Sequence, residues 1–103
     1  NSTLILAGQR TFYGAQLSGI GSAPAYLKLY DTATAPVCGT DTPKKVLMIP
    51  AASTAANGAG SNVMLPFGSA FFNGLGICVV TGIADSDNTS VAAATFIINI
   101  DYK

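Results

Sequence analysis

Apolar residues occur along this chain in short runs, and clusters of Gly, Pro, Ser and Asn separate the runs. The clearest run is Ala25–Asp31, in which Ala and Leu residues alternate with Tyr26, Lys28 and Tyr30. Successive side chains of a β-strand point to opposite faces of its sheet, so a period of two predicts a strand with one buried face.

Shorter or less regular apolar runs predict further strands. Six such segments are Thr3–Ala7, Arg10–Ser18, Lys44–Ile49, Asn62–Phe67, Leu75–Thr81 and Val91–Tyr102. Pro66 is expected to break its strand, because proline cannot donate a ladder hydrogen bond. Gly-rich composition predicts a loop at Ala51–Ser61 and a turn region at Gly68–Gly74.

Seven or eight short strands without a helix predict an all-β fold. We expect residues 1–103 to form a single-domain antiparallel β-sandwich, jelly-roll-like, with an immunoglobulin-like sandwich as the alternative. Strand order is not determined by the sequence pattern, because different sandwiches share it.

Composition narrows the possible functions. The 103 residues include five Lys and Arg and five Asp and Glu, so the net charge is zero, and half of the residues are hydrophobic. Such a chain is too apolar for disorder, and it lacks the basic surface that binds nucleic acid. The absence of His removes the usual general base and the commonest metal ligand. We therefore expect no enzyme activity, no cofactor and no metal.

Two further features concern the membrane and the cysteines. Pro50 and Pro66 interrupt the longest uncharged stretch, so no membrane-spanning helix and no membrane partner are expected. Cys38 and Cys78 allow one disulfide, which the sequence does not settle. Free thiols are the preferred interpretation, because Cys78 lies in an apolar run where a buried thiol behaves as a small hydrophobe.

The segment Asp85–Thr89 has the acidic spacing of a calcium loop. An EF-hand loop also needs Gly at its sixth position and Glu at its twelfth, and here these positions are Ser90 and Phe96. The segment is therefore predicted to be a turn in which Asp and Asn side chains bond to nearby backbone.

Tyr26, Lys28 and Tyr30 form the candidate partner interface. They share the outward face of the Ala25–Asp31 strand, and tyrosines beside a lysine are typical of protein interfaces. The equally weighted alternative is that another segment of the same chain covers them.

Several segments resemble a group of small proteins encoded among the structural genes of tailed bacteriophages. The segments are Ala23–Asp31, Thr34–Pro36, Gly39–Pro43, Gly82–Asp87, Val91–Ala93 and Ile98–Tyr102. The Tyr-Leu-Lys-Leu-Tyr-Asp and Gly-Thr-Asp-Thr-Pro stretches are the most distinctive.

The resemblance implies a structural role on a virion. Small β-sandwiches of this size serve phages as capsid cement or decoration proteins, which bind between capsomers and stabilise the shell. The expected partners are the major capsid protein and further copies of this chain, as a dimer or trimer. The alternatives are another virion component, such as a neck, tail or head-fibre protein, or a non-phage filament or adhesin subunit. In a filament, the apolar strand Thr3–Ala7 could complete a neighbour's sheet.

Overall fold

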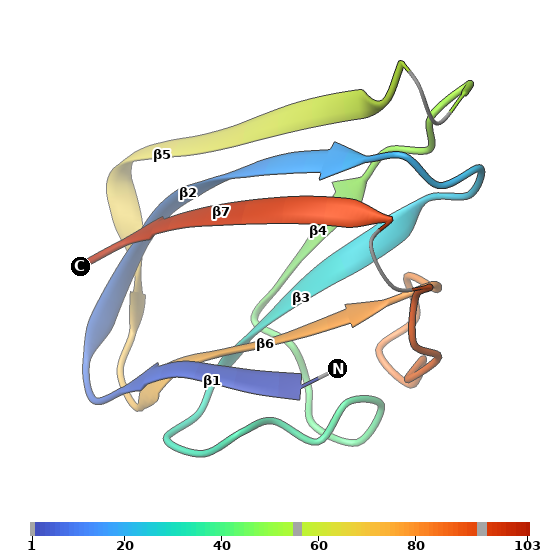
Figure 1. Cartoon of the computed structure of the whole chain (residues 1–103). Coiled ribbons are helices and arrows are strands. Elements are labelled where there is room, and N and C mark those ends of the chain that lie inside the picture. The colour runs from blue at the N-terminus through green and yellow to red at the C-terminus, as the bar shows by residue number, and fades with distance from the viewer. Residues whose placement is uncertain (1, 55–56, 93–94) are drawn as a thin grey trace.

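The computed structural model describes residues 2–54, 57–92 and 95–103. In this part of the chain there are seven strands and no helix, as predicted (Figure 1). The strands are β1 (Ser2–Ala7), β2 (Arg10–Gly19), β3 (Ala25–Asp31), β4 (Lys45–Ile49), β5 (Ala59–Phe71), β6 (Gly74–Val80) and β7 (Phe96–Tyr102).

The strands form two antiparallel sheets. One has four strands in the order β1-β6-β3-β4, and the other has three in the order β5-β2-β7. The two sheets form an all-β sandwich, which confirms the predicted fold class (Figure 1). β6, β3 and β2 have a neighbour on both sides, so the four sheet edges belong to β1, β4, β5 and β7.

The main core lies between the sheets. β3 contributes Leu27 and Leu29 to it, and β2 contributes Phe12 and Leu17, all of them buried. The ring of Phe12 meets that of Phe71 edge to face, with centroids 6.3 Å apart. Each such side chain contributes roughly 1.5–3 kcal/mol by leaving water. The alternation that predicted β3 therefore arises from this core.

β5 differs most from its prediction. It continues past Pro66 and extends from Ala59 to Phe71, whereas the sequence predicted only Asn62–Phe67. Two causes account for the difference. β5 is an edge strand, so the missing N–H of Pro66 is not needed by a second neighbour. The residues at either end of β5 also pair with the long strand β2, from Arg10 to Gly19.

The predicted loop and turn boundaries change accordingly. The loop predicted for Ala51–Ser61 is shortened, because β5 already begins at Ala59, and residues 55–56 of that prediction lie outside the described residues. Within the predicted turn Gly68–Gly74, only residues 72 and 73 lie between β5 and β6. The last predicted strand, Val91–Tyr102, begins only at Phe96, and residues 93–94 of that prediction lie outside the described residues.

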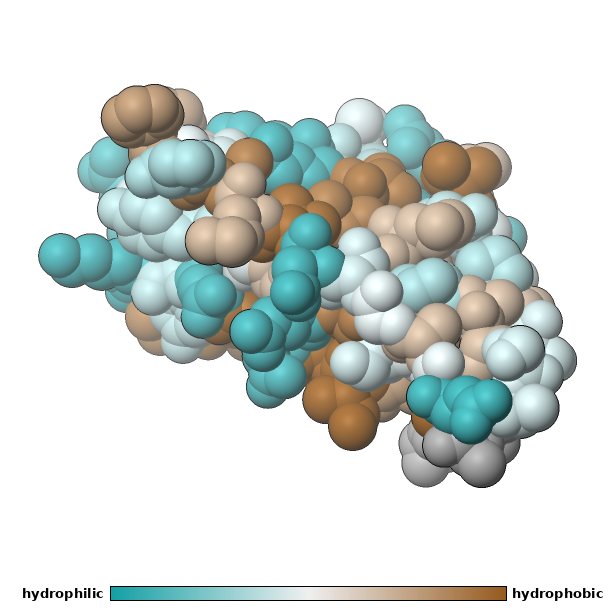
Figure 2. All heavy atoms as spheres, turned by 90° about the horizontal axis from the view of Figure 1, so that it is seen from above, coloured by the Kyte–Doolittle hydropathy of each residue, from teal (hydrophilic) through white to brown (hydrophobic). Residues whose placement is uncertain are grey.

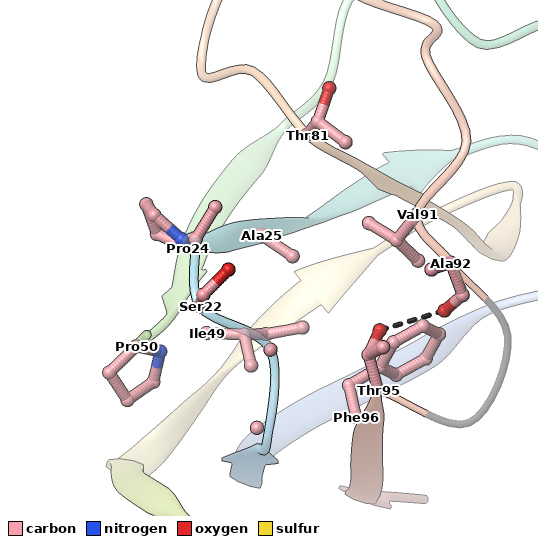
Figure 3. A pocket seen from close by; sticks show the side chains of 13 residues that line it. Ser22, Pro24, Ala25, Ile49, Pro50, Thr81, Val91, Ala92, Thr95 and Phe96 are labelled. Atoms are coloured by element: carbon pink, nitrogen blue, oxygen red, sulfur yellow. Dashed lines mark hydrogen bonds between the residues drawn. The ribbon is translucent and has the colours of Figure 1, made fainter. Parts of the chain in front are cut away.

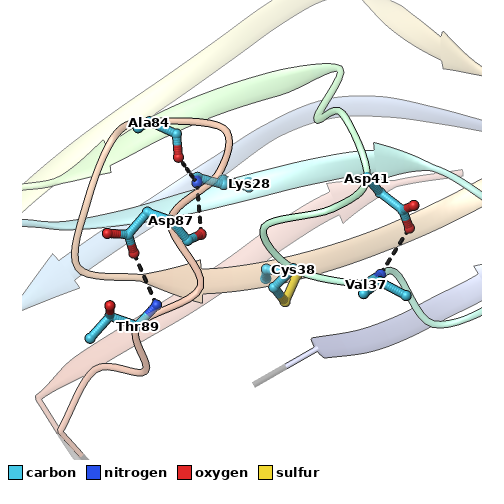
Figure 4. Close-up of a disulfide and its surroundings, with 8 residues drawn as sticks. Lys28, Val37, Cys38, Asp41, Ala84, Asp87 and Thr89 are labelled. Carbon is cyan, nitrogen blue, oxygen red and sulfur yellow. Dashed lines mark hydrogen bonds between the residues drawn. A yellow bond between two sulfur atoms is a disulfide. The ribbon is translucent and has the colours of Figure 1, made fainter.

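Cys38 and Cys78 form a disulfide, so the preferred interpretation of free thiols is wrong (Figure 4). Their Cα atoms are 6.1 Å apart, at a sequence separation of 40. Cys78 is fully buried, as its apolar run indicated. The sequence did not reveal that Cys38 lies beside it. The connection of residues 32–44 folds over the outer face of β6 and brings Cys38 to Cys78.

Candidate functional site

The predicted row on β3 lies under two connections of the same chain. Tyr26, Lys28 and Tyr30 share one face of β3, but Lys28 and Tyr30 are buried and Tyr26 is half-buried. Residues 32–44 and 81–90 cover this face through the disulfide and through contacts with Lys28. The structure thus shows the alternative interpretation, coverage by the same chain. A partner can reach Lys28 and Tyr30 only if these connections move.

Lys28 holds the connection of residues 81–90 against the sheet. Its Nζ donates hydrogen bonds to the backbone carbonyls of Ala84 and Asp87, the second at 3.2 Å (Figure 4). The backbone N–H of Asp87 also donates to Ala84 O at 2.9 Å, and the Asp87 carboxylate accepts from the N–H of Thr89 at 3.0 Å. The predicted turn, with an Asp side chain bonded to nearby backbone, is confirmed.

Tyr30 lies in a second, smaller core on the outer face of the four-stranded sheet. Its buried neighbours are Cys78 and Val80. The hydroxyl has no hydrogen-bond partner among the described residues. Burial raises the pKa of Tyr30, and the negative charges of Asp41 and Asp85 raise it further, because both disfavour a phenolate.

The pKa of the Asp31 carboxylate is lowered from its usual value. Burial opposes its ionisation, but the backbone N–H groups of Asn73, Phe72 and Gly74 donate to it, and Lys44 lies nearby. These interactions outweigh burial and lower the pKa of Asp31. The carboxylate fixes the turn between β5 and β6, with distances of 2.7 Å to Asn73 N and 3.0 Å to Phe72 N.

The described part of the chain does not gather three or more metal-ligating side chains of the Cys, Asp, Glu or His type at one place. A helix long and apolar enough to cross a bilayer is likewise not found among the described residues.

A bulge on β5 carries the most exposed large apolar side chain. Gly14 pairs with Met64 and Phe12 with Ser69, so four residues of β5, Leu65–Gly68, lie opposite Tyr13 alone. We call Leu65–Gly68 the β5 bulge. Phe67 within it is 98% exposed, and Met64 just before it is 82% exposed.

Gly68 makes this bulge possible. Its φ is +74°, a conformation that residues with a Cβ rarely adopt. A Cβ at Gly68 would also lie 2.4 Å from the methyl group of Thr11, so the residue must be glycine for the chain to turn here. The sequence feature that marks the site is the Pro66-to-Gly68 segment, which predicted a break in the strand rather than an outward-projecting ring.

Seen from above, the face that includes β5 shows several hydrophobic patches among polar side chains (Figure 2). β5 runs along the top of the molecule in Figure 1 and turns downward at the left, where the strand bulges. Because this strand is also a sheet edge, both its backbone and its apolar side chains are available to another protein.

A hollow of about 230 Å³ lies at the end of β2 that includes Gly19, away from the β5 bulge (Figure 3). Its walls come from the β2–β3 connection, the end of β4 and the segment before β7. The lining includes Ile49, Pro50, Val91 and Phe96, and none of its side chains is charged. We call it the end hollow. Pro24 and other exposed residues at its rim leave it open to solvent.

Comparison of the chain with protein-family models, with curated proteins and with solved structures finds no significant match. Function is therefore argued from the sandwich, the β5 bulge and the covered face of β3.

Proposed function

We propose that this protein is a structural subunit that acts by binding protein surfaces, without catalysis, as the decoration or cement protein of a tailed-phage capsid. The observation that carries the proposal is the β5 bulge, which holds Phe67 almost completely in water. A phenyl ring gains free energy by leaving water, so holding it on a specialised bulge indicates a partner that covers it. Aromatic anchors of this kind supply most of the affinity at many interfaces.

The low charge of the chain supports the same role. Only 10% of its residues are charged, and a free small domain usually carries more. Interface cores are depleted in charged residues, because ions lose their hydration there. A surface of this composition is suited to contact with neighbouring protein rather than with water alone.

The proposed mechanism is preferential binding to an assembled shell. A protein that binds the intact shell, but not its dissociated subunits, stabilises the shell by mass action. Many symmetry-related copies make even weak individual contacts effective. The proposed partners are the major capsid protein and further copies of this chain, on the outside of the virion, with no cofactor, nucleic acid or membrane.

The open edge of β1 favours a second candidate, a filament or adhesin subunit outside the cytoplasm. Disulfides persist in oxidising compartments and are rare in the cytosol. β1 is an open edge strand without a charged residue, which suits strand addition between subunits. In this case the subunits would form a helical array of this chain alone.

The experiment that separates the candidates is imaging of native particles with symmetry averaging. Decoration predicts hundreds of copies on an icosahedral lattice, with the β5 bulge against a capsomer. A few copies at one vertex would place the protein in the neck or tail. A helical array of this chain alone, or its absence from every capsid, would overturn the decoration role.

A matched pair of variants tests the β5 bulge within the same experiment. Phe67→Ser is expected to reduce occupancy on the particle, because it removes the exposed ring without touching the core. Ile97→Ser, at a 65% exposed position on β7, is the control and should leave occupancy unchanged. Equal occupancy of the two variants would show that the bulge is not the anchor.

A further inference from the structure

We propose that the Asn57–Gly58 peptide is a site of spontaneous deamidation, whereas Asp31 protects the Asn73–Gly74 peptide from the same reaction. The sequence contains these two Asn-Gly pairs and no other. The proposal goes beyond the structural role above and does not depend on it. It rests on three observations: the exposure of both asparagine side chains, the hydrogen bonds of the two peptides, and the space around each glycine.

The reaction needs only the peptide itself and water. The backbone nitrogen of the glycine loses its proton and forms a bond to the Cγ atom of the preceding asparagine. The side-chain nitrogen of the asparagine takes up a proton and leaves as ammonia. Water then opens the cyclic imide at either carbonyl, which gives aspartate or isoaspartate. Glycine favours this reaction, because it has no Cβ to hinder the approach and its backbone adopts many conformations.

Solvent access does not distinguish the two pairs. The side chains of Asn57 and Asn73 are both exposed, so water reaches both of them. In each pair, however, the glycine nitrogen must also move onto the side chain of the asparagine before the new bond can form. A difference in rate between the two sites therefore comes from how firmly each peptide is held.

The carboxylate of Asp31 holds the Asn73–Gly74 peptide. It accepts a hydrogen bond from the N–H of Asn73 at 2.7 Å, and the N–H of Gly74 lies next to the same carboxylate. The carbonyl of Asn73 accepts from the N–H of Gly8 at 2.9 Å, so the chain is also held on the opposite side. Hydrogen bonds to an ionised acceptor are roughly twice as strong as those between neutral groups. The negative charge also opposes loss of the proton from the Gly74 nitrogen.

Gly74 has little room to rotate. A Cβ at this position would lie 2.3 Å from the carbonyl oxygen of Thr32 and 2.9 Å from that of Leu6, so two backbone oxygens lie close to the glycine. Gly74 is also the first residue of β6, and it pairs with Ala7 of β1. Rotation of the peptide towards the Asn73 side chain would break this pairing. The reaction at Asn73 therefore requires local opening of the sheet.

The Asn57–Gly58 peptide is bonded to its own connection between β4 and β5. The N–H groups of Asn57 and Gly58 donate to the carbonyl of Thr54, at 3.2 Å and 3.1 Å, and this acceptor is neutral and belongs to an exposed residue. A Cβ at Gly58 would have its nearest atoms at 3.5 Å and 3.8 Å, which is ordinary contact, so the peptide has room to rotate. Connections held by such short-range bonds open at a lower free-energy cost than paired strands.

Deamidation at Asn57 changes both the charge and the backbone. The chain has a net charge of zero, so the product carries one negative charge more than positive charges. Isoaspartate also adds a methylene group to the backbone shortly before Ala59, where β5 begins and pairs with Gly19 of β2. An acidic form of the protein with an altered start of β5 should therefore accumulate with age.

The test is incubation of the purified protein at mildly alkaline pH, followed by peptide mass spectrometry of the residue 57 and residue 73 segments. Deamidation at Asn57 should be at least about tenfold faster than at Asn73, because Asn73 must first lose hydrogen bonds to a charged acceptor. In concentrated urea the two rates should become similar, because the fold no longer holds either peptide.

Asp31→Asn tests the protection directly. It should raise the rate at Asn73 at least about tenfold and leave the rate at Asn57 unchanged, because only the former peptide loses its ionised acceptor. The matched control is Lys28→Met, which weakens the fold at the connection of residues 81–90 instead. It should leave the rate at Asn73 unchanged, which separates the effect of the Asp31 carboxylate from a general loss of stability.

A second pair of variants identifies the modified residue. Asn57→Gln should remove most of the acidic form, because the longer glutamine side chain cyclises more slowly, whereas Asn73→Gln should not. Equal rates at Asn57 and Asn73 in the folded wild type would overturn the proposal. An Asp31→Asn variant whose rate at Asn73 matches that of the wild type would overturn it as well.

Discussion

Lys28 on β3 and Asp87 in the connection before β7 are joined by a hydrogen bond from the lysine Nζ to the aspartate carbonyl, at 3.2 Å. Ala84 O accepts a second hydrogen bond from the same ammonium. The connection of residues 81–90 is therefore bound by the ammonium group of Lys28, a cation from the same chain. A turn with the acidic composition of a calcium loop is held by a lysine.

Replacing Lys28 with Met should lower the free energy of unfolding by about 1–3 kcal/mol, because two carbonyl groups lose a charged donor. Met retains the apolar stem of the side chain, so little of the loss comes from packing. The measurement is urea denaturation, with hydrogen exchange to follow residues 81–90, which should exchange faster. Lys103→Met, at an exposed lysine, is the control. Unchanged exchange in this connection would show that Lys28 does not hold it.

Tyr30 should make the protein sensitive to alkali. Its folded-state pKa is raised above 10.0 by burial and by Asp41 and Asp85, so the folded state keeps a proton that the unfolded state releases. The contribution of Tyr30 to the free energy of unfolding is then fully present below pH 10 and is lost as the pH rises through its folded-state pKa. Tyr30→Phe should remove most of this loss between about pH 9.5 and 11.

At neutral pH, Tyr30→Phe should cost little, because the hydroxyl has no partner among the described residues. Thermal melting at pH 7 and pH 10.5 separates the two effects. A large loss of stability at pH 7 would mean that the hydroxyl is hydrogen-bonded in solution. Tyr13→Phe, at an exposed tyrosine, serves as the control for alkaline effects elsewhere.

Asp31 should act in the opposite pH range. Its folded-state pKa lies below the ordinary value of 3.8, so the unfolded state binds the proton first as the pH falls. The contribution of the Asp31 carboxylate to the free energy of unfolding is present above about pH 5 and is lost as the pH drops through the folded-state pKa of Asp31. Asp31→Asn should therefore be less stable than the wild type at pH 7, and the difference should shrink towards pH 2. A constant difference across that range would exclude ionisation as its cause.

The disulfide should contribute about 4 kcal/mol in the chain-entropy model, given the sequence separation of 40 between Cys38 and Cys78. Reduction should therefore lower stability strongly and release residues 32–44 from the sheet. The readout is the denaturation midpoint with and without reductant. The double variant Cys38→Ser, Cys78→Ser should match the reduced protein and show no response to reductant.

The predicted elements were most accurate where one physical cause dominates. β3 has its predicted bounds, because alternation and flanking turns both come from its central place in the sandwich. β5 was predicted too short, because the effect of Pro66 depends on whether a strand is at an edge. Edge position is a property of the whole fold and has no local signature.

The candidate interface shows the same limit. The sequence correctly placed Tyr26, Lys28 and Tyr30 on one face of a strand, but exposure depends on what covers that face. The cover consists of two irregular connections, one of which is held by a disulfide between distant cysteines. The β5 bulge was missed for a related reason, since Phe67 occurs in a segment whose pattern indicated only a strand end.

The order of strands in the sheets determines how this chain reaches its fold. β1 pairs with β6, and β2 pairs with β7, so the first strands made wait for partners from the far end of the chain. Loop-closure entropy opposes such distant pairings, and sandwiches of this type fold in milliseconds to seconds. During that interval the apolar strand β1 is unpaired, which makes the refolding yield fall as the chain becomes more concentrated.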